Sequence, residues 1–133
     1  MSGRLTVTVG LPGSGKSTWA QAQPGAVIIE RDIIRHELTG DARNHSAEGR
    51  VTGIARARVH GALAEGKYVI VSDTNLAAKT RRQWKTLAES LDAVYDELYF
   101  VDVALEVCIE RDARREHPVG ADVIRSMHQR YLS

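Results

Sequence analysis

The fold of this chain is decided by Gly10-Leu11-Pro12-Gly13-Ser14-Gly15-Lys16-Ser17-Thr18. From Gly10 to Ser17 these residues fit the phosphate-binding loop pattern G-x-x-x-x-G-K-[ST]. The glycines permit left-handed turns that aim successive backbone N–H groups at phosphate oxygens. Lys16 adds a cation for the β- and γ-phosphates, and the hydroxyl of Ser17 suits Mg²⁺. We therefore expect residues 10–18 to bind a nucleoside triphosphate and to present its terminal phosphate for chemistry.

The residues on either side of the loop supply the strand and the helix that such a loop requires. An apolar alternation, Leu5-Thr6-Val7-Thr8-Val9, precedes the loop, and Thr18-Trp19-Ala20-Gln21-Ala22 follows it. A helix that starts at Ser17 directs its positive end toward the bound anion. This context favours a phosphate site over the alternative, which is a glycine-rich turn without a ligand.

Beyond the loop, buried-strand patterns alternate with helical patterns along the chain. We predict further strands over residues 26–29, 68–71 and 96–101. Helices are expected over residues 31–39, 47–64, 77–91, 105–115 and 121–131. Such alternation is typical of βαβ crossovers, so the predicted fold is α/β, a parallel sheet of about four strands with helices on both faces. Ligands then bind beyond the carboxyl ends of the strands.

Length and composition indicate one domain, residues 1–133, because domains of this size bury a sufficient core. The net charge of +1 limits any nucleic-acid contact to a local patch. Apolar runs such as Ala26–Ile29 are too short to span a bilayer and no secretory signal is apparent, so we expect a cytoplasmic protein without membrane contact. Cys108 is alone, which argues against a disulfide, and Cys108 and Trp19 are interpreted as core residues. The sequence leaves the oligomeric state open.

Asp32 follows the second predicted strand, where an acceptor hydroxyl can approach the terminal phosphate. A carboxylate there can orient that hydroxyl and accept its proton as the general base of phosphoryl transfer. The alternative is an ordinary helix N-cap, a position that Asp favours. The usual capping-box partner three residues on is replaced by Arg35, which favours the catalytic interpretation.

Two more polar side chains are expected near the acceptor. Arg35 lies one turn beyond Asp32 and is predicted to grip a phosphate or carboxylate of the acceptor, the alternative being a weak surface ion pair with Asp32. Asp73 ends a buried strand, the placement of an acid that holds Mg²⁺ or its water. Asp73 also suits orientation of the acceptor, and the plainer alternative is a turn in which its side chain bonds the backbone near Asn75.

An arginine cluster precedes the break at His117-Pro118. Arg111 and Arg115 lie four residues apart, with Arg114 adjacent, and are predicted to close as a lid that neutralises charge on the transferred phosphoryl group. The alternative is a solvated helix face on which these arginines pair with acidic neighbours, namely Glu110, Asp112 and Glu116.

The phosphate loop is shared by many unrelated enzymes, whereas the combination of several further motifs is far more specific for one family. These motifs are Arg31-Asp32 with Arg35, Glu48-Gly49 with Val51-Thr52-Gly53, Ser72-Asp73-Thr74-Asn75-Leu76, Arg111 with Arg115, and Asp122-Val123-Ile124-Arg125-Ser126-Met127. With them, nearly the whole chain resembles the 5′-kinase domain of bacteriophage polynucleotide kinase, a nucleic-acid end-healing enzyme. The resemblance implies a P-loop kinase fold with an arginine-bearing lid. It also implies transfer of the γ-phosphate of ATP to 5′-hydroxyl ends of DNA or RNA.

On the donor side, the resemblance implies that Lys16 and Ser17 bind the phosphates of ATP and Mg²⁺. Arg115, assisted by Arg111, would be the lid arginine on the same phosphates. These roles agree with those expected from the residues themselves.

On the acceptor side, the resemblance implies that Asp32 is the general base for the 5′-hydroxyl and that Arg35 holds the neighbouring phosphate. Asp73 and Thr74 would support the acceptor site, and Val119 would contact the terminal base. The identity of the acceptor comes from the resemblance alone.

The chain departs from that family in places. Gly120 stands where the family carries Pro, and no D-x-D-x-T motif of a fused 3′-phosphatase follows, so we expect a kinase without phosphatase activity. Two other functions stay open. One is a small-molecule kinase acting on a sugar, nucleoside or antibiotic hydroxyl, and the other is a nucleotide-dependent switch without transfer activity. The chain lacks a guanine-reading [NT]-K-x-D segment, which argues against a GTPase-type switch.

Overall fold

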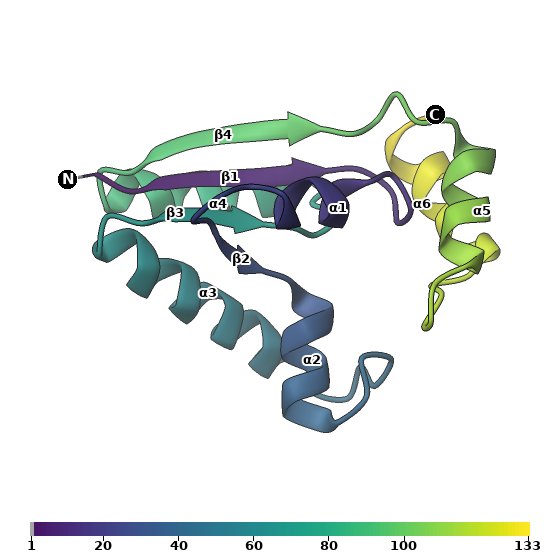
Figure 1. Cartoon of the computed structure of the whole chain (residues 1–133), viewed down its shortest axis with the longest axis horizontal. Coiled ribbons are helices and arrows are strands. Elements are labelled where there is room, and N and C mark those ends of the chain that lie inside the picture. Colours follow the sequence, from purple (N-terminus) through teal and green to yellow (C-terminus); the bar gives the residue numbers. More distant parts are fainter. Residues whose placement is uncertain (1) are drawn as a thin grey trace.

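A parallel sheet of four strands forms the centre of the computed structural model, which describes residues 2–133 (Figure 1). The strands are β1 (Arg4–Val9), β2 (Val27–Ile29), β3 (Tyr68–Val71) and β4 (Val94–Tyr99), in the order β2-β3-β1-β4. Leu5 of the central strand β1 pairs with Val69 of β3 and with Tyr95 of β4. Every pairing is parallel, so the carboxyl ends of the strands meet at one edge of the sheet and the predicted α/β fold is confirmed.

The helices described within residues 2–133 are α1 (Lys16–Gln21), α2 (Arg31–Thr39), α3 (Glu48–Ala64), α4 (Ala78–Ser90), α5 (Leu105–Ala113) and α6 (Ala121–Tyr131). α3 and α4 pack on one face of the sheet, and α1 lies in front of the other face in Figure 1. α5 and α6 contact each other beyond the carboxyl ends of the strands. None of the helices in this described part of the chain has the length and apolar character needed to cross a bilayer.

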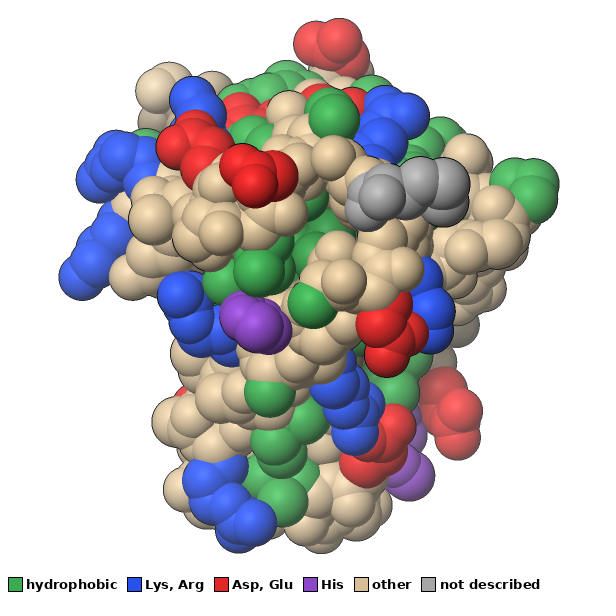
Figure 2. Space-filling model, turned by 90° about the vertical axis from the view of Figure 1, so that its left-hand side faces the viewer, with side chains coloured by type: hydrophobic (Ala, Val, Ile, Leu, Met, Phe, Trp, Pro, Cys, Tyr) green, Lys and Arg blue, Asp and Glu red, His purple; other side chains and the backbone are tan. Residues whose placement is uncertain are grey.

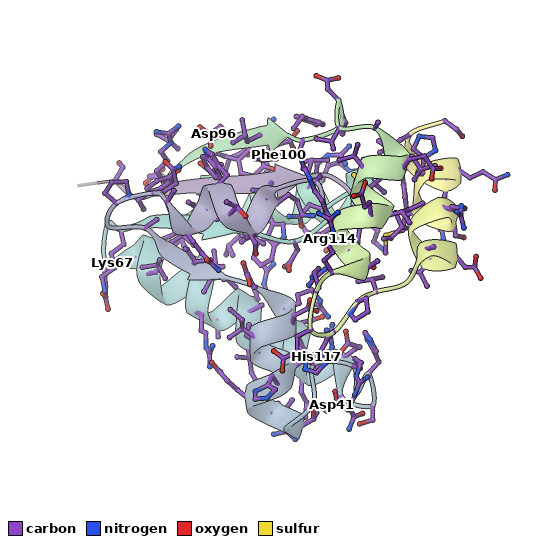
Figure 3. The ribbon with its side chains drawn as sticks, turned by 45° about the vertical axis from the view of Figure 1, so that its right-hand side comes forward. Asp41, Lys67, Asp96, Phe100, Arg114 and His117 are labelled. Atoms are coloured by element: carbon purple, nitrogen blue, oxygen red, sulfur yellow. The ribbon has the colours of Figure 1, made fainter. Side chains whose placement is uncertain are left out.

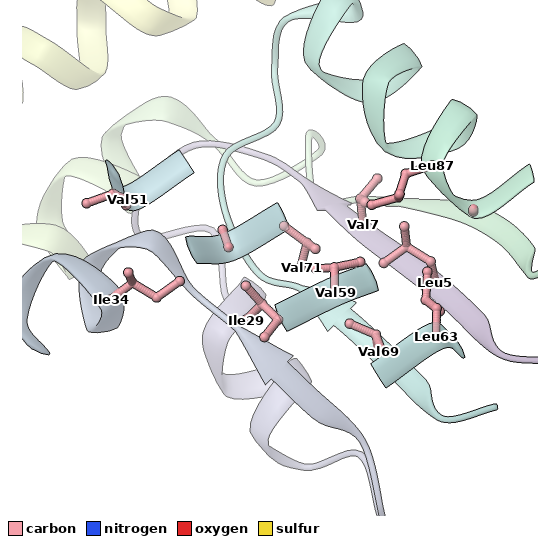
Figure 4. Packing of buried hydrophobic residues seen from close by; sticks show 12 residues of the cluster. Leu5, Val7, Ile29, Ile34, Val51, Val59, Leu63, Val69, Val71 and Leu87 are labelled. Atoms are coloured by element: carbon pink, nitrogen blue, oxygen red, sulfur yellow. The ribbon is translucent and has the colours of Figure 1, made fainter. Parts of the chain in front are cut away.

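The main core lies between the sheet and α3. Leu5 and Val7 of β1 alternate with threonines and pack with Val69 and Val71 of β3 (Figure 4). α3 contributes a stripe of fully buried residues at four-residue spacing, namely Val51, Ala55, Val59 and Leu63. Each buried Val or Leu side chain stabilises the fold by about 1.5–3 kcal/mol, so this stripe fixes α3 against the central strands.

A second core cluster lies beyond the carboxyl end of β1 and joins the phosphate loop to α5 and α6. Its buried members are Val9, Leu11, Leu76, Cys108 and Ile124. Cys108 is 1% exposed, which confirms its predicted place in the core. Because Leu11 belongs to the loop, packing of this cluster sets the position of the loop relative to the lid helices.

The prediction that Trp19 is a core residue is wrong. Trp19 is only half-buried, and its ring meets that of Phe100 at a centroid distance of 6.0 Å and an angle of 59°. α1 has only six residues, so it offers the core little surface beyond Lys16 and Ala20. Phe100, labelled in Figure 3, follows β4 directly and covers part of the indole.

The element bounds differ from the predicted ones by one or two residues in several places. α1 begins at Lys16, one residue earlier than predicted. β4 begins at Val94 and ends at Tyr99, each two residues before the predicted limits. α5 ends at Ala113, so Arg115 lies in the segment after the helix.

The surface at the amino ends of the strands carries both signs of charge. Figure 2 shows this face, on which acidic and basic side chains are interspersed among apolar ones. Lys67, just before β3, pairs there with Glu65 at 2.7 Å. This mixed surface agrees with the low net charge and offers no extended basic patch to a polyanion.

Replacing Gly13 with alanine should destabilise the protein more than replacing Gly15. Both residues have positive φ, +81° and +99°, so a side chain at either costs about 1–2 kcal/mol of backbone strain. At Gly13 the new Cβ would also lie 2.2 Å from the carbonyl oxygen of Cys108 in α5, whereas at Gly15 it would meet nothing within 4 Å. Urea unfolding of Gly13→Ala and Gly15→Ala checks this difference, and equal losses would contradict the close packing of α5 on the loop.

Candidate active site

The loop between β1 and α1 adopts the conformation that its motif predicts. Gly13 and Gly15 both lie in the left-handed region, which glycine adopts without strain. The N–H of Gly10 donates to the carbonyl of Thr74 at 3.0 Å and so fixes the loop against the end of β3. The hydroxyl of Ser14 is buried and has no hydrogen-bond partner within residues 2–133. A buried hydroxyl without a partner lowers the stability of the fold by about 1–3 kcal/mol. A ligand oxygen, such as that of a phosphate, can accept its hydrogen bond and remove this penalty.

Lys16 is a buried ammonium group at the first position of α1. It is 8% exposed, and its Nζ donates to the carbonyl of Leu11 at 2.8 Å. Burial lowers the pKa of Lys16 to about 8, against the opposing effect of the nearby Asp73 carboxyl, and Arg115 lowers it further. An ammonium in this setting gains strongly from an anion beside it, which fits the predicted role on the donor phosphates.

Ser17, the predicted metal ligand, lies beside an acid that the motifs do not single out. Its hydroxyl donates to Oε1 of Glu30 at 2.6 Å, and Glu30 is the residue just before α2. Residues 2–133 contain no group of three or more side chains that could hold a metal ion by themselves. Mg²⁺ takes few protein ligands and completes its coordination with phosphate oxygens and water, so Ser17 and Glu30 fit a metal that arrives with a nucleotide.

Asp32 occupies the second position of α2, and the N-cap residue is Glu30. The alternative that Asp32 caps the helix is therefore wrong. Its carboxylate, half exposed, accepts from Arg35 Nη1 at 2.6 Å and lies 3.7 Å from Arg115 Nη2. Two arginines from different segments thus converge on this one carboxylate.

Arg35 is buried at 4% exposure, so the surface ion pair considered for it does not describe its environment. Its Nε and Nη2 donate to the two carboxylate oxygens of Glu48 at 2.8 and 2.6 Å, and Nη1 donates to Asp32 and to the Ala42 carbonyl. Four of its five N–H groups are thereby used, which leaves one for a ligand. These hydrogen bonds lower the pKa of Glu48 to about 2 and raise that of Arg35.

Asp73 lies at the end of β3, where its carboxylate accepts from the backbone N–H of Arg31 at 3.0 Å. This contact fixes the start of α2 against the end of β3. Burial raises the pKa of Asp73 to about 6. The alternative role in a local turn belongs to Asn75 instead, whose side-chain amide donates to the carbonyls of Thr8 and Asp73 at 2.9 and 3.3 Å.

The three arginines of the predicted lid differ in their partners. Arg111 Nη1 donates to the Gly13 carbonyl in the phosphate loop at 3.4 Å. Arg115 turns inward, with Nη1 at 3.3 Å from Asp112 and Nη2 near Asp32. Arg114 pairs with Glu110 on the surface, as the solvated-face alternative expects, and the pair of Arg115 with Asp112 also belongs to that alternative.

Asp112 fixes the segment that follows α5, a role that the sequence did not indicate. From the sequence, Asp112 was expected only as a surface partner of the arginines. Its carboxylate is 1% exposed and accepts the backbone N–H groups of Val119 and Gly120 at 3.0 and 2.9 Å. These bonds fold the chain back after α5 and explain why the helix ends before Arg115. The side chain of Val119, predicted to contact the acceptor, is half-buried against the second core cluster.

The lid loop of residues 114–120 comes close to the loop between α2 and α3. Figure 3 shows His117 of the first loop above Asp41 of the second. His117 contributes to a lowered pKa of Asp41, after the larger effect of the backbone hydrogen bond from Arg43. Two loops that are far apart in sequence therefore lie close together.

Phosphoryl transfer needs a donor loop and a second set of side chains that faces it, and this chain brings both to one edge of its sheet. The chain is a P-loop kinase domain by its family and its fold, and this class binds ATP. The family model described as an AAA domain, AAA_33, matches residues 5–133, and the chain belongs to this family.

Two curated relatives are similar over almost the whole chain. The putative bifunctional polynucleotide kinase/RNA ligase of Autographa californica nuclear polyhedrosis virus is 30% identical, over 98% of this chain and 21% of its own length. The L-seryl-tRNA(Sec) kinase of Methanococcus maripaludis is 26% identical, over 96% of this chain and 52% of its own length. The chain thus spans about a fifth of one relative and about half of the other.

Solved structures share the fold at lower identity. A chain of the Pnkp1/Rnl/Hen1 RNA repair complex has a TM-score of 0.83 and 24% identity, over 98% of this chain and 44% of that chain. Kti12 from Chaetomium thermophilum in complex with ADP-AlF3 has a TM-score of 0.73 and 23% identity, over 97% and 80%. A gluconokinase from Sinorhizobium meliloti 1021 has a TM-score of 0.63 and 22% identity, over 99% and 76%.

ATP affinity should fall as pH rises above about 8, because Lys16 then loses the proton that attracts phosphate. A bound anion raises the pKa of Lys16, so the decline should approach about tenfold per pH unit. Titration of a fluorescent ATP analogue between pH 7 and 10 measures this decline in affinity. Lys16→Arg is the control, because arginine stays protonated throughout this range. We expect weaker but pH-independent binding by this variant, and an equal decline in both proteins would contradict the role of Lys16.

Proposed function

We propose that the protein is an ATP-dependent polynucleotide kinase that transfers the γ-phosphate to 5′-hydroxyl ends of DNA or RNA, as in nucleic-acid repair. The observation that carries the proposal is the approach of Arg115 to Asp32 at 3.7 Å. It places a carboxylate suited to proton abstraction next to a cation suited to the transferred phosphoryl group. The 30% identity to a putative polynucleotide kinase/RNA ligase supports this acceptor.

On the donor side, residues 10–18 hold the phosphates of ATP through their backbone N–H groups, with Lys16 at the β- and γ-phosphates. Mg²⁺ at Ser17 and Glu30 supplies neutralisation of phosphate charge when it is bound. Arg111 already contacts the loop, so a short movement takes its guanidinium to the phosphates. Arg115 exchanges Asp32 for the γ-phosphate as the nucleotide binds.

On the acceptor side, Asp32 takes the proton of the 5′-hydroxyl. The hydroxyl oxygen forms the new bond to the γ-phosphorus, and the bond between the γ-phosphorus and ADP breaks. Arg35 holds the Asp32 carboxylate in place and offers its remaining N–H to the neighbouring phosphate of the acceptor. Asp73 and Thr74 border the acceptor at the end of β3, and Val119 borders the terminal base from the lid.

A small-molecule kinase is the second candidate, because the gluconokinase has the same fold at 22% identity. Incubation with labelled ATP and Mg²⁺ separates the two functions. Oligonucleotides with a 5′-hydroxyl should accept the label, while gluconate, nucleosides and aminoglycosides should not. Label on a small molecule alone would overturn the proposal, and hydrolysis without transfer to any acceptor would indicate a switch.

Asp32→Ala should lower kcat by at least about 10²-fold, because the attacking hydroxyl then has no general base. Binding of ATP should change far less, since Asp32 does not contact the phosphate loop. Glu37→Ala is the matched control, because Glu37 lies on the same helix and, within residues 2–133, pairs only with Arg58 on the surface. Steady-state kinetics with a 5′-hydroxyl oligonucleotide measure both variants. Equal rates for Asp32→Ala and the wild type would remove Asp32 from the role of base.

A further inference from the structure

Residues 72–76, which follow β3, join the two halves of the candidate site. The carbonyl of Thr74 accepts from the N–H of Gly10, the first residue of the phosphate loop, at 3.0 Å. The carboxylate of Asp73 accepts from the N–H of Arg31, where α2 begins, at 3.0 Å. An N–H in the first turn of a helix has no partner within that helix, so Asp73 completes the start of α2 from another element. A shift of this segment would therefore move the phosphate loop and the helix of the proposed base relative to each other.

The turn in the middle of this segment needs support from its surroundings. Asn75 lies in the left-handed region at φ +43°, a conformation that costs free energy in any residue with a side chain. Its buried amide donates to the carbonyls of Thr8 and Asp73 at 2.9 and 3.3 Å. A strained backbone persists only where its neighbours fix it, and such places cluster at functional sites. The next question is which side chain holds the carbonyl of Asn75 itself.

Arg81, in the first turn of α4, supplies that contact. Its Nη1 donates to the carbonyls of Asn75 and Leu76 at 2.9 and 2.7 Å. The side chain of Arg81 is only 20% exposed, so these hydrogen bonds are largely shielded from water. Because a charged donor forms a stronger hydrogen bond than a neutral one, Arg81 fixes the peptide group between the two carbonyls.

β4 holds the guanidinium of Arg81 from its other side. Nε of Arg81 lies 3.8 Å from Oε2 of Glu97, and the guanidinium lies 5.9 Å from the ring centre of Tyr99. Glu97 is fixed in turn, because the hydroxyls of Tyr95 and Tyr99 donate to its two oxygens at 2.7 and 2.6 Å. These three residues alternate along β4 and so share the face that packs on α4. Only a planar, branched cation can meet the carboxylate and the two carbonyls together.

We propose that Arg81 is a positioning residue for phosphoryl transfer, which acts on the site through residues 72–76. The inference rests on the proposed function, because it concerns the alignment of Asp32 with the phosphate loop. Misalignment of reacting groups lowers the rate of the chemical step much more than it weakens the binding of either substrate. Loss of Arg81 should therefore lower kcat and leave both KM values nearly unchanged.

Steady-state kinetics with ATP and a 5′-hydroxyl oligonucleotide test this expectation. Arg81→Ala should lower kcat about 10- to 100-fold, whereas the KM for ATP and for the oligonucleotide should change less than about threefold. Arg81→Lys should recover part of the loss, because an ammonium can still donate to the two carbonyls. Arg82→Ala is the matched control, because Arg82 is the exposed neighbour of Arg81 on α4.

The space beside Arg81 permits chemical rescue. A cavity of about 230 Å³ lies between α4 and β4 and is lined by Arg81, Lys85 and Glu97, among others. In Arg81→Ala this cavity opens toward the carbonyls of residues 75 and 76. Methylguanidinium in solution should then restore part of kcat, whereas methylurea, which has a similar shape without the charge, should not. Equal effects of the two compounds would overturn the role of the guanidinium.

Amide hydrogen exchange, measured by NMR without substrates, gives a readout that does not depend on transfer. The N–H groups of Gly10 and Arg31 should exchange faster in Arg81→Ala, because the segment that carries their acceptors is released. The N–H of Val59, in the core on α3, should keep its rate. If Arg81→Ala does not fold, Glu97→Gln replaces it, with the same pattern and a smaller loss of kcat.

Faster exchange at Gly10 and Arg31, with no transfer by the wild type to any acceptor, would uphold the hold of Arg81 on residues 72–76 and overturn the proposed function. An unchanged kcat in Arg81→Ala, or unchanged exchange at these two amides, would overturn the inference and leave the proposed function intact. Equal acceleration at Val59 would show a loss of global stability and would also overturn the inference.

Discussion

A buried guanidinium has to be neutralised, and this requirement brings the segments around the candidate site together. Arg35 is 4% exposed and would be costly to bury alone, by several kcal/mol. Glu48 from the start of α3, Asp32 from the start of α2 and the carbonyl of Ala42 meet its N–H groups. The loop between α2 and α3 is thereby closed, and the Asp32 carboxylate is held facing the lid. Removal of Glu48 would leave the charge of Arg35 only partly compensated.

The sequence predicted the features that depend on neighbours along the chain. Five alternating residues of β1, the loop that follows and the apolar stripe of α3 each carry a local pattern, so the sheet and the conformation of the loop could be derived. The parallel direction of the strands also followed, because βαβ crossovers join parallel strands. The end of α5 could not be derived, since it depends on the carboxylate of Asp112 accepting N–H groups seven and eight residues later.

Hydrogen bonds between side chains that are distant in sequence could not be predicted from residue spacing. Glu30 beside Ser17, and Glu48 beside Arg35, are each 13 residues away in sequence and become neighbours only when β2 and α2 are in place. The ion pair of Asp32 and Arg35, considered as an alternative, does form, but its arginine is buried, which nothing local in the sequence indicates. For Trp19 the prediction erred in the opposite direction, because this aromatic residue was expected in the core. The short helix α1 buries little surface, so its side chain stays half-buried. Glu30 could have been singled out in the sequence, because it is an acidic residue directly after the strand β2.

The hydrogen bonds of Asp112 turn the end of α5 and the start of α6 into a closed ring that carries Arg115. A long flexible arm would lose conformational freedom in every catalytic cycle before its charge reached the phosphate. In a ring of this size most of that entropy is already lost when the protein folds. In the proposed reaction Arg115 then needs only a change of partner, and most of the entropy cost of ordering its side chain is incurred when the protein folds rather than in each turnover.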